Sequence, residues 1–316
     1  MTGRNEPRIC VVGSSNMDLI SKIPRLPKMG ETLVGSHFHM GCGGKGANQA
    51  AMAAKLGGSV TMVTKLGRDP MGETTLKNYK DLGIDTRFVM FDDERFSGVA
   101  PILVDDNGRN MIVIVPGAND GLSPQDVRRA ADAIERADVL ICQLEIPTET
   151  TLEALRIARS AGVKTIFNPA PAQPLSEELI SLSDIIAPNE TEAEIICEMP
   201  IHDVSQAEAS ASKLRAMGAA VVMITLGENG VLVADDDGTR QVPAVPTEAV
   251  DTTGAGDAFV GSLAYFLSLG ITVDEAVRRS NVVAALSVRK VGTQVSFPTR
   301  SEVADSQRLL LPSRQG

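Results

Sequence analysis

Two hydrophobic periods alternate along most of the chain, and their order predicts the class of fold. Segments with apolar residues at helical spacing are followed by short, continuous apolar runs of the kind that form buried strands. The predicted helices are PQDVRRAADAIERA (124–137), TTLEALRIARSAG (150–162), SEELISLS (176–183), NETEAEIIC (189–197) and SQAEASASKLRAMG (205–218). The strands between them are DVLICQLE (138–145), VKTIFNP (163–169), DIIAPN (184–189) and AAVVMITLG (219–227). Such alternation is typical of an α/β fold with a mainly parallel sheet and helices on both faces.

The N-terminal third both extends this sheet and departs from it. RICVVGSSN (8–16) and SVTMVTKLG (59–67) predict buried strands, with a helix over GANQAAMAAKLGG (46–58) between them. The stretches 17–40 and 97–117 instead alternate polar and apolar residues, and the second contains an Asn-Gly hairpin signal. We interpret both as antiparallel strands of a separate small sheet, used as a lid over a site.

This interpretation divides the chain into two parts. We expect residues 16–44 and 96–116 to form the lid, and residues 1–15, 45–95 and 117–316 to form the α/β core. Pro101 falls within a lid strand, and because proline cannot donate to a ladder we expect an edge position or a bulge there. The last dozen residues are expected to be a frayed tail.

Composition limits the partners that the chain can have. Hydrophobic residues make up 43% and charged residues 22%, as in ordinary globular proteins, and no apolar run reaches the ~18 residues of a membrane span. The formal net charge of -10 argues against a nucleic-acid or anionic-membrane surface, although backbone amides and a cation can still hold a small phosphorylated ligand. The four cysteines form no CxxC pair and the N-terminal MTGRNEPR precedes no apolar signal region. We therefore expect reduced thiols and a cytoplasmic protein.

Polar residues that follow predicted strands are the first candidates for a site, because ligands of open α/β sheets bind beyond the carboxyl ends of the strands. Asn16 and Asp18 follow the first strand, where they suit paired sugar hydroxyls or, equally well, an Asx turn. The run GCGGKG (41–46) has the G-x-G-x-x-G spacing, but it lacks the buried strand before it and the Ser or Thr of a P-loop. It predicts a close backbone approach to a ligand, with Lys45 and Asn48 beside it.

Two other pairs allow more than one interpretation. Asn189 and Glu192 form N-x-x-E at a helix start, and on the local pattern alone a helix cap is favoured over hydrated Mg²⁺. His37 and His39 would face one side of a strand, but without a third ligand nearby they give little support to a metal site.

The segment VDTTGAGDAFVGSLAYFLSLG (250–270) carries the clearest chemistry. Gly254, Ala255 and Gly256 precede an amphipathic helix and can aim their N–H groups at one anion. Asp257 follows at once, either as an ordinary first-turn acid or as a functional carboxylate. Two glycines around one alanine are a poor choice for helix stability alone, which favours a function.

Taken together, these segments resemble the ribokinase family of carbohydrate kinases. The resemblance covers nearly the whole chain, in order, on VVGSSNMDLI, GCGGKGANQA, CQLEIP, NPAPA, PNETEAE, VVMITLGENGV, DTTGAGDAFVGSL and KVGTQ. It implies a three-layer α/β/α fold with a small β-sheet lid that also forms a homodimer contact. The implied reaction is the ATP-dependent phosphorylation of D-ribose at its 5-hydroxyl.

The family pattern also implies roles for individual residues. The sugar would be held by Asn16, Asp18, Gly44, Lys45, Asn48, Glu145 and Asp257. ATP would be contacted by Asn189, Thr225, Leu226, Gly227, Glu228, Asn229, Gly230, Gly256 and Asn281. A monovalent cation, usually K⁺, would lie near Asp251, Thr253, Ser287, Lys290, Gly292 and Ser296. Asn189 and Glu192 would organise Mg²⁺ and its waters, which reverses the preference for a simple cap.

Phosphoryl transfer mainly requires an acceptor held in line and neutralised charge on the moving group. The 254–256 amides, Mg²⁺ and Lys45 would neutralise that charge, and Asp257 would accept the proton of the sugar hydroxyl. Two alternatives stay open: a family kinase with another acceptor, such as 2-deoxyribose, fructose or adenosine, and a non-catalytic sugar sensor. The intact base, glycine turn and N-x-x-E argue against the sensor.

Overall fold

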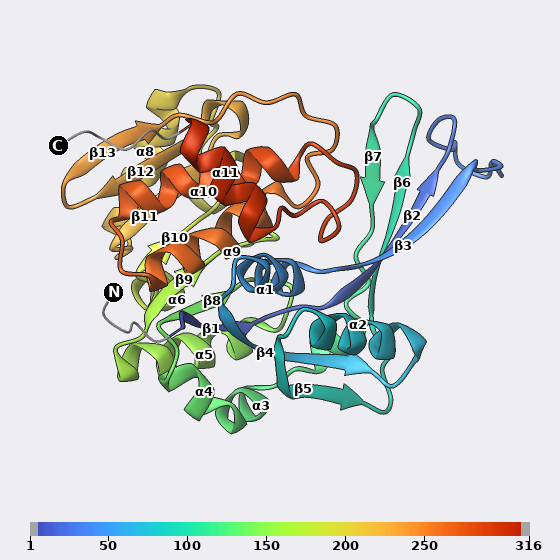
Figure 1. Cartoon of the computed structure of the whole chain (residues 1–316), viewed down its shortest axis with the longest axis horizontal. Helices are drawn as coiled ribbons and strands as arrows, with labels where there is room; N and C mark the ends of the chain where they lie inside the picture. Colours follow the sequence, from blue (N-terminus) through green and yellow to red (C-terminus); the bar gives the residue numbers. More distant parts are fainter. Residues whose placement is uncertain (1–5, 311–316) are drawn as a thin grey trace.

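The chain forms one large sheet between two layers of helices, with a smaller sheet beside it (Figure 1). The computed structural model describes residues 6–310. Across the large sheet the order is β13 (Gly238–Val242), β12 (Val231–Asp235), β11 (Val221–Thr225), β10 (Ile185–Ile186), β9 (Lys164–Phe167), β8 (Val139–Cys142), β1 (Arg8–Val12), β4 (Ser59–Gly67) and β5 (Asp85–Asp92). All neighbours pair in parallel except β11 with β12 and β12 with β13, so the predicted mainly parallel sheet is confirmed.

Helices cover both faces of the large sheet. One face carries α1 (Lys45–Lys55), α2 (Pro70–Asp81), α9 (Ala255–Ser268) and α10 (Val273–Ser287), with α11 (Arg300–Leu310) packed outside α10. The other carries α3 (Pro124–Arg129), α4 (Ala131–Glu135), α5 (Thr148–Ala161), α6 (Glu177–Ser181), α7 (Glu190–Cys197) and α8 (Val204–Ala216). Two 3₁₀ turns are also present, η1 (Gly117–Gly121) and η2 (Gly227–Asn229).

The central strands are buried on both faces, which explains their continuous apolar runs. Ile9 and Val11 of β1 face the core beneath α1 and α9, whereas Cys10 and Val12 face the core beneath α5. Because successive strand residues point to opposite faces, both sets must be apolar when each face is covered. Full burial of such a side chain contributes about 1.5–3 kcal/mol, so the layered core is the main source of stability.

Two local expectations about helices were wrong or incomplete. The helix predicted over 124–137 is two helices, because the chain turns tightly at Ala130, whose N–H bonds to the carbonyl of Val127. Val127, Ala130 and Ile134 are all buried, as their helical spacing predicts. The predicted frayed tail is also wrong as far as Leu310, where α11 ends, and residues 311–316 lie outside the described part of the chain.

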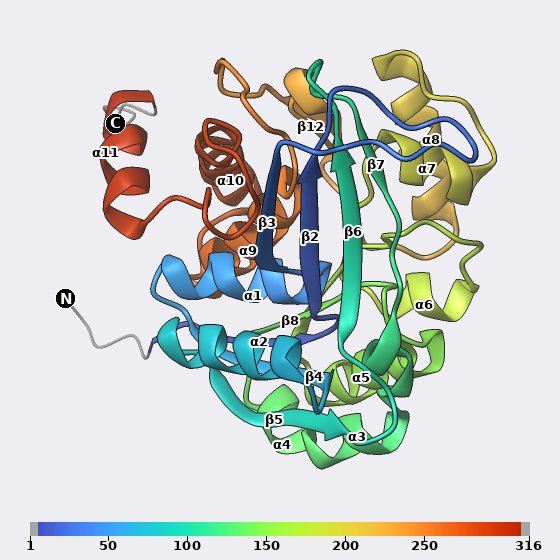
Figure 2. The ribbon, with the colours of Figure 1, turned by 90° about the vertical axis from the view of Figure 1, so that its right-hand side faces the viewer.

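The small sheet has the order β3 (His37–Gly43), β2 (Asn16–Lys22), β6 (Gly98–Val104) and β7 (Asn110–Ile112), and stands beside the core as four adjacent strands (Figure 2). A separate small sheet was predicted, but purely antiparallel pairing was not correct. β2 pairs with β3, and β6 with β7, in antiparallel fashion, whereas β2 and β6 are parallel. The reason is that β1 and β5 end at the same edge of the large sheet, so the strands that follow them leave in the same direction.

Pro101 lies in β6, an interior strand, so the expected edge position is wrong. Its carbonyl accepts a hydrogen bond from the N–H of Val113, on the side of β7. The ladder between β6 and β7 ends at the pair Ile102 and Ile112. Since the N and O of one strand residue point to the same side, the missing N–H of Pro101 removes the return bond to Val113, and regular pairing stops there until the bridge between Val99 and Val115.

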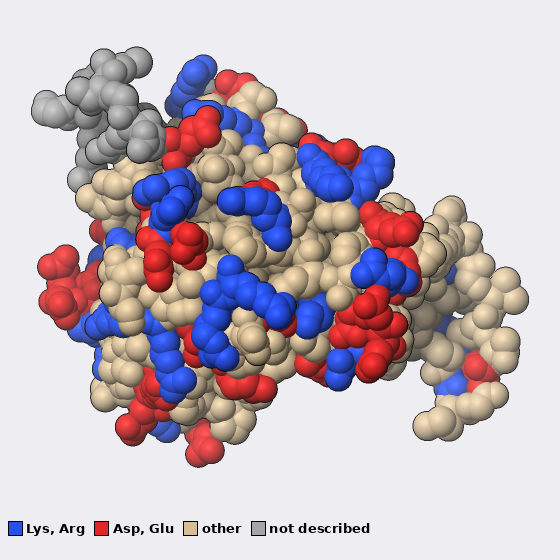
Figure 3. Space-filling model, turned by 90° about the horizontal axis from the view of Figure 1, so that it is seen from below, with Lys and Arg blue, Asp and Glu red and all other residues tan. Residues whose placement is uncertain are grey.

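One face of the molecule has mixed charge, and no membrane-spanning helix was found between residues 6 and 310. None of the helices there combines the length and apolar character that a span requires. On the face seen in Figure 3, lysine and arginine side chains are interspersed with acidic ones, and no broad field of one sign is formed. That face therefore lacks the basic surface typical of nucleic-acid binding.

Candidate active site

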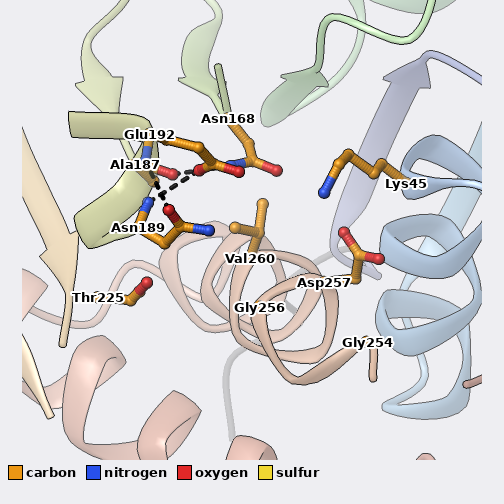
Figure 4. A pocket seen from close by; sticks show the side chains of 10 residues that line it. All are labelled: Lys45, Asn168, Ala187, Asn189, Glu192, Thr225, Gly254, Gly256, Asp257 and Val260. Carbon is orange, nitrogen blue, oxygen red and sulfur yellow. Dashed lines mark hydrogen bonds between the residues drawn. The ribbon is translucent and has the colours of Figure 1, made fainter. Parts of the chain in front are cut away.

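A pocket opens at the carboxyl ends of the central strands, where ligands of open α/β sheets are expected. Its lining is Lys45, Asn168, Ala187, Asn189, Glu192, Thr225, Gly254, Gly256, Asp257 and Val260. Figure 4 shows Lys45 and Asp257 on one side of the space, and Asn189, Glu192 and Thr225 on the other. Seven of these residues were candidates from the sequence; Asn168, Ala187 and Val260 were not.

Helix α9 begins at the edge of this pocket. Gly254 is its N-cap residue with φ 79° and ψ 1°, a left-handed conformation that favours glycine, and no side chain caps the helix. The N–H groups of a first helical turn have no partner within the helix and lie at the positive end of its dipole. The N–H of Ala255 already donates to the carbonyl of Thr252 at 3.2 Å, so this one of the three candidate amides is engaged.

Asp257 lies one residue further along α9 and is held by two amide side chains. Asn48 Nδ2 donates to Asp257 Oδ2 and Gln49 Nε2 donates to Asp257 Oδ1, both at 2.9 Å. Asp257 is buried, with 8% of its surface exposed, so it is not an ordinary solvated first-turn acid. Each carboxylate oxygen retains a further lone pair, which leaves it able to accept a proton from a ligand hydroxyl.

Close packing of α1 on α9 brings these three residues together. A Cβ built on Gly261, one turn after Asp257, would lie only 2.4 Å from the carbonyl oxygen of Gln49. Real Cβ atoms essentially never lie within 3.0 Å of such an atom, so only glycine lets the two helices approach this closely. The distance between Asp257 and its amide partners therefore depends on a residue with no polar side chain.

The start of α1 is tied to the end of β8 through Glu145. Its Oε2 accepts hydrogen bonds from the backbone N–H of Lys45 at 3.0 Å and from Ser14 Oγ at 2.5 Å. Burial would lower the pKa of the Lys45 ammonium, but nearby carboxylates outweigh burial and raise it. Those carboxylates belong to Asp257, Glu145 and Glu192. Lys45 is therefore a fully charged cation that faces the pocket.

Asn16 and Asp18 lie on the first residues of β2, paired with β3 and β6, so the alternative of an Asx turn is wrong. Asn119 Nδ2 donates to Asn16 Oδ1 at 2.8 Å and Thr293 Oγ1 donates to Asp18 Oδ2 at 3.3 Å. A Cβ on Gly43 would lie 2.2 Å from Asp18 Oδ1, so the glycine segment gives this carboxylate its space.

The pKa of Asp18 is raised to about 7, chiefly because burial disfavours its charged form. The carboxylates of Glu145 and Asp257 raise it further, whereas the hydrogen bond from Thr293 lowers it. Asp18 therefore changes charge near neutral pH in the unliganded protein.

Asn189 and Glu192 form a reciprocal capping box at the start of α7. Glu192 N donates to Asn189 Oδ1, and Asn189 N donates to Glu192 Oε2, both at 2.8 Å. The cap favoured on the local pattern is therefore present, and both residues also line the pocket. Burial, with a smaller contribution from Asp257, raises the pKa of Glu192, while its bond from Asn189 and the charge of Lys45 lower it.

The residues expected near a nucleotide lie around the turn from β11 to β12. Thr225 lines the pocket and forms a bridge with Asn189, whereas Leu226–Gly230 continue beyond the pocket lining. The turn closes through the N–H of Leu226, which donates to the carbonyl of Gly230 at 2.7 Å. Asn281 is held apart from the pocket lining by bonds to the carbonyls of Val242 (3.4 Å) and Pro243 (2.9 Å).

The residues expected near a monovalent cation come from two loops that the Asp251 carboxylate joins. Its Oδ1 accepts from Thr253 N and its Oδ2 from Gly292 N, each at 2.9 Å. Lys55 Nζ donates to the carbonyls of Gln294 (2.6 Å) and Phe297 (3.0 Å) in the second loop. Ser287 and Ser296 are buried nearby, and Lys290 instead pairs with Glu302 on the surface.

Clusters of three or more His, Cys, Asp or Glu suited to a metal ion were not found among residues 6–310. His37 and His39 are exposed on β3. Cys10, Cys142 and Cys197 are buried free thiols and Cys42 is a half-buried one.

Several side chains that organise the site were not candidates from the sequence. They are Ser14, Gln49, Asn119, Gln143, Asn168, Thr293 and Gln294. Gln49 and Asn168 lie within motifs that were recognised, GGKGANQA and NPAPA, but nothing in the local pattern distinguishes their roles. Along the chain, Gln49 lies 119 residues from Asn168 and 208 residues from Asp257, so only the fold brings the three side chains together.

The family follows from a comparison with known proteins. The description "pfkB family carbohydrate kinase" is matched by residues 6–300. The chain belongs to the pfkB family of carbohydrate kinases. As a member of this family it is a kinase that transfers a phosphoryl group to an alcohol, and the pocket around Asp257 is its candidate active site.

Individual members of the pfkB family are similar over nearly the whole chain. A ribokinase from Mus musculus is 44% identical over 300 residues, which cover 93% of each chain. A deoxyribokinase from Salmonella typhi is 41% identical over 292 residues, which cover 92% of this chain and 95% of that protein. A solved structure of an Arabidopsis thaliana ribokinase complexed with ribose and ATP has a TM-score of 0.88 at 31% identity, over 96% of this chain and 99% of that one. The ribokinase-like fold with its smaller sheet is thus confirmed.

Proposed function

We propose that this kinase phosphorylates D-ribose at the 5-hydroxyl, with ATP as the phosphoryl donor. The observation that carries the proposal is the position of Asp257: a buried carboxylate, oriented by two amides, beside the glycine turn that opens α9. Similarity to ribokinases over most of the chain, at up to 44% identity among those compared, supports ribose as the acceptor.

In the proposed reaction, different groups of the pocket act on the sugar and on the phosphoryl group. The ribose hydroxyls would be held by Asn16, Asp18, Gly44, Asn48 and Glu145, together with Lys45. Asp257 would accept the proton of the 5-hydroxyl as the oxygen attacks the γ-phosphorus, because an alcohol is a poor nucleophile until it loses that proton. The bond from that phosphorus to the bridging oxygen breaks, and ADP leaves.

Charge on the transferred phosphoryl group would be neutralised from the other side. The free N–H groups at Gly254 and Gly256, with Ala255 between them, lie at the positive end of α9, and the Lys45 ammonium faces the same pocket. The substrate stands between these groups and the carboxylate of Asp257. Repulsion between an acid and an anion at one helix start is thereby avoided.

The residues at the ATP side fit the expected ions. The capping box uses Asn189 Oδ1 and Glu192 Oε2, so Glu192 keeps its second oxygen for Mg²⁺ or its waters. Mg²⁺, when bound, would neutralise charge on the phosphates. The Asp251 carboxylate joins the loops at Thr253 and Gly292, whose backbone oxygens suit K⁺ beside the start of α9. The nucleotide itself would lie along Thr225–Gly230 and near Asn281.

A second acceptor, 2-deoxyribose, is favoured by one specific observation. A deoxyribokinase is 41% identical, close to the value for the ribokinase from mouse. The two sugars differ only at the 2-hydroxyl, and a buried carboxylate such as Asp18 loses a hydrogen-bond partner when that group is absent. Fructose and adenosine are less favoured family alternatives.

The test is coupled ADP release with ribose, 2-deoxyribose, fructose and adenosine, each with Mg²⁺ and with or without K⁺. We expect ribose to have the highest kcat/KM and K⁺ to raise it. In Asp257→Asn the rate should fall by at least about 10²-fold while ribose binding persists, since the proton acceptor is lost and the other residues proposed to hold the sugar remain. Ribose-independent rates, or full turnover by D257N, would contradict the proposed reaction and base, respectively.

We also propose that two copies of the chain associate through their small sheets. Apolar side chains are exposed on the outer strands and the segment after β7, among them Phe38 (63%), Met40 (54%), Met111 (50%) and Val113 (54%). Apolar groups of this kind on a small projecting sheet are typical of a protein contact. The sheet would also serve as a lid that excludes water from the transfer. A cytoplasmic location stays a prediction from composition.

A further inference from the structure

Two chains of hydrogen-bonded amide side chains converge on the carboxylate of Asp257. The first runs from Gln143 to Gln49 to Asp257 Oδ1, with donor–acceptor distances of 2.6 and 2.9 Å. The second runs from Asn78 to Gln294 to Asn48 to Asp257 Oδ2, with distances of 2.8, 3.1 and 2.9 Å. In both chains every amide donates its N–H toward Asp257, and Gln49, Gln294 and Asn48 each accept on their oxygen from the amide behind them.

The direction of the first chain follows from a backbone group that can only accept. Asn168 Nδ2 donates to the carbonyl oxygen of Ala187 at 2.8 Å, so Asn168 turns its Oδ1 toward Gln49. Gln49 Nε2 must then be the donor, and it serves Asn168 Oδ1 at 3.0 Å as well as Asp257. The Oε1 of Gln49 consequently faces Gln143, which donates to it.

The direction of the second chain follows from the carboxylate, which when ionised has acceptors only. Asn48 must present Nδ2 to Asp257, so its Oδ1 accepts from Gln294 Nε2. Gln294 in turn accepts from Asn78 on α2. Its backbone carbonyl is held by Lys55, so this glutamine is fixed at both its side chain and its main chain.

The chains are buried at a cost, which argues against a role in stability alone. Gln49 and Gln143 have no exposed surface, and Gln294 has 7%. Gln143 Oε1 has no hydrogen-bond partner among the described residues, and a buried unpaired oxygen costs roughly 1–3 kcal/mol. A Cβ on Gly13 would lie 2.0 Å from that same oxygen, so the end of β1 leaves room for it. A methionine would fill the position of Gln143 without this cost.

We propose that Gln143, Gln49 and Gln294 are positioning residues that orient the Asp257 carboxylate toward the hydroxyl of the bound sugar. The inference rests on the proposed role of Asp257 as base. Amides in series polarise one another, so a remote member strengthens the last bond to the carboxylate as well as fixing its direction. Removing Gln143 or Gln294 should therefore weaken catalysis without touching any substrate.

The test compares Gln143→Met and Gln294→Met with the wild-type full chain and with Gln173→Met. Gln173 donates to Thr148 Oγ1 on α5 and belongs to neither chain, so it controls for loss of an amide. We expect kcat to fall about three- to thirtyfold in Q143M and Q294M, with KM for ATP within twofold, because a misoriented base loses part of its effect.

Thermal unfolding separates this role from a structural one. Q143M removes the unpaired Gln143 Oε1 but leaves Gln49 Oε1 without its donor, so its Tm should stay close to that of the wild type while its kcat falls. Unchanged kcat in Q143M and Q294M at wild-type Tm would overturn the inference. So would a loss of activity that only follows the loss of folded protein.

Failure of the inference can be told apart from failure of the proposed function. Variants are assayed with whichever sugar or nucleoside the wild type phosphorylates, so a wrong acceptor alone leaves the comparison intact. The side-chain NH₂ resonances of Gln49 in ¹⁵N-labelled protein report on this series of hydrogen bonds and require no catalysis. They should shift in both Q143M and D257N but not in Q173M, and the absence of those shifts would refute the chain even if the wild type were inactive.

Discussion

Gly261 has no functional group, yet we expect its replacement by alanine to damage catalysis more than stability. It lies one turn after Asp257 on α9, at the closest approach to α1. The added Cβ would lie 2.4 Å from the carbonyl oxygen of Gln49 and 3.0 Å from the Cβ of Met52. Since ordinary contact begins at 3.4 Å, the two helices must separate by about 1 Å at this point.

The two consequences of Gly261→Ala have different sizes. Overpacking costs about 1–3 kcal/mol, but alanine in place of glycine favours the helix by about 1 kcal/mol, so the free energy of unfolding should fall by at most ~2 kcal/mol. A shift of ~1 Å between Asp257 and its amide partners on α1 is expected to lower kcat by about 10²-fold, because proton transfer requires a fixed geometry. The KM for ATP should change little.

Urea unfolding followed by circular dichroism gives the first quantity, and coupled ADP release under saturating substrates gives the second. Ser268→Ala, near the end of the same helix, is the control for a substitution in α9, because Ser268 bonds only to the carbonyl of Tyr265 in its own helix. A G261A protein with wild-type kcat, or one that is more stable by the full helix-propensity gain, would show that the helices do not need this close approach.

Two other predictions concern Asp18 and the small sheet. Because the pKa of Asp18 is raised to about 7 by burial, and only its ionised form accepts two sugar hydroxyls, ribose affinity should rise as pH increases from about 5 to 8. Calorimetry in buffers of different ionisation enthalpy should detect proton release below pH 7; no release, or the same pH dependence in Asp18→Asn, would exclude Asp18 as the cause. For the dimer, Met40→Asp should yield a monomer in sedimentation velocity at micromolar concentration, since a charge would be buried in an apolar contact. If the wild type itself sediments as a monomer, or M40D as a dimer, the small sheet is not the contact.

The layered core could be predicted because its signal is local. The strands between residues 138 and 227 follow from continuous apolar runs, which reflect burial on two faces. The helices follow from helical spacing of apolar residues, which reflects burial on one face. α2 was missed although Asp69 caps it and Pro70 occupies its first turn, because its exposed polar residues hide the apolar period. The hairpin of β12 and β13 was missed because these two strands pair in antiparallel fashion at the end of a sheet whose other strands follow the parallel pattern.

The site was predictable only in part. Residues such as Asp18, Lys45 and Asp257 have types and neighbours that indicate chemistry by themselves. The amides that orient Asp257 do not, because a glutamine in a helix or loop is ordinary until its partner is known. Gln294 and Asn48 are 246 residues apart, and the parallel pairing of β2 with β6 likewise depends on where distant strands end. Such features depend on three-dimensional proximity and not on sequence period.

The placement of Asn16 and Asp18 on β2 has a consequence for how affinity is set. These residues belong to the small sheet, while Asp257 and Lys45 belong to the core, so a sugar bound by both sets would be a physical link between them. Any free energy needed to bring the small sheet into its closed position would then be subtracted from the binding energy of the sugar. A substitution that biases the sheet toward closure would tighten binding without touching the sugar. A sugar that lacks one hydroxyl would bind more weakly for the same reason, because its remaining contacts would supply less of the free energy needed to close the small sheet.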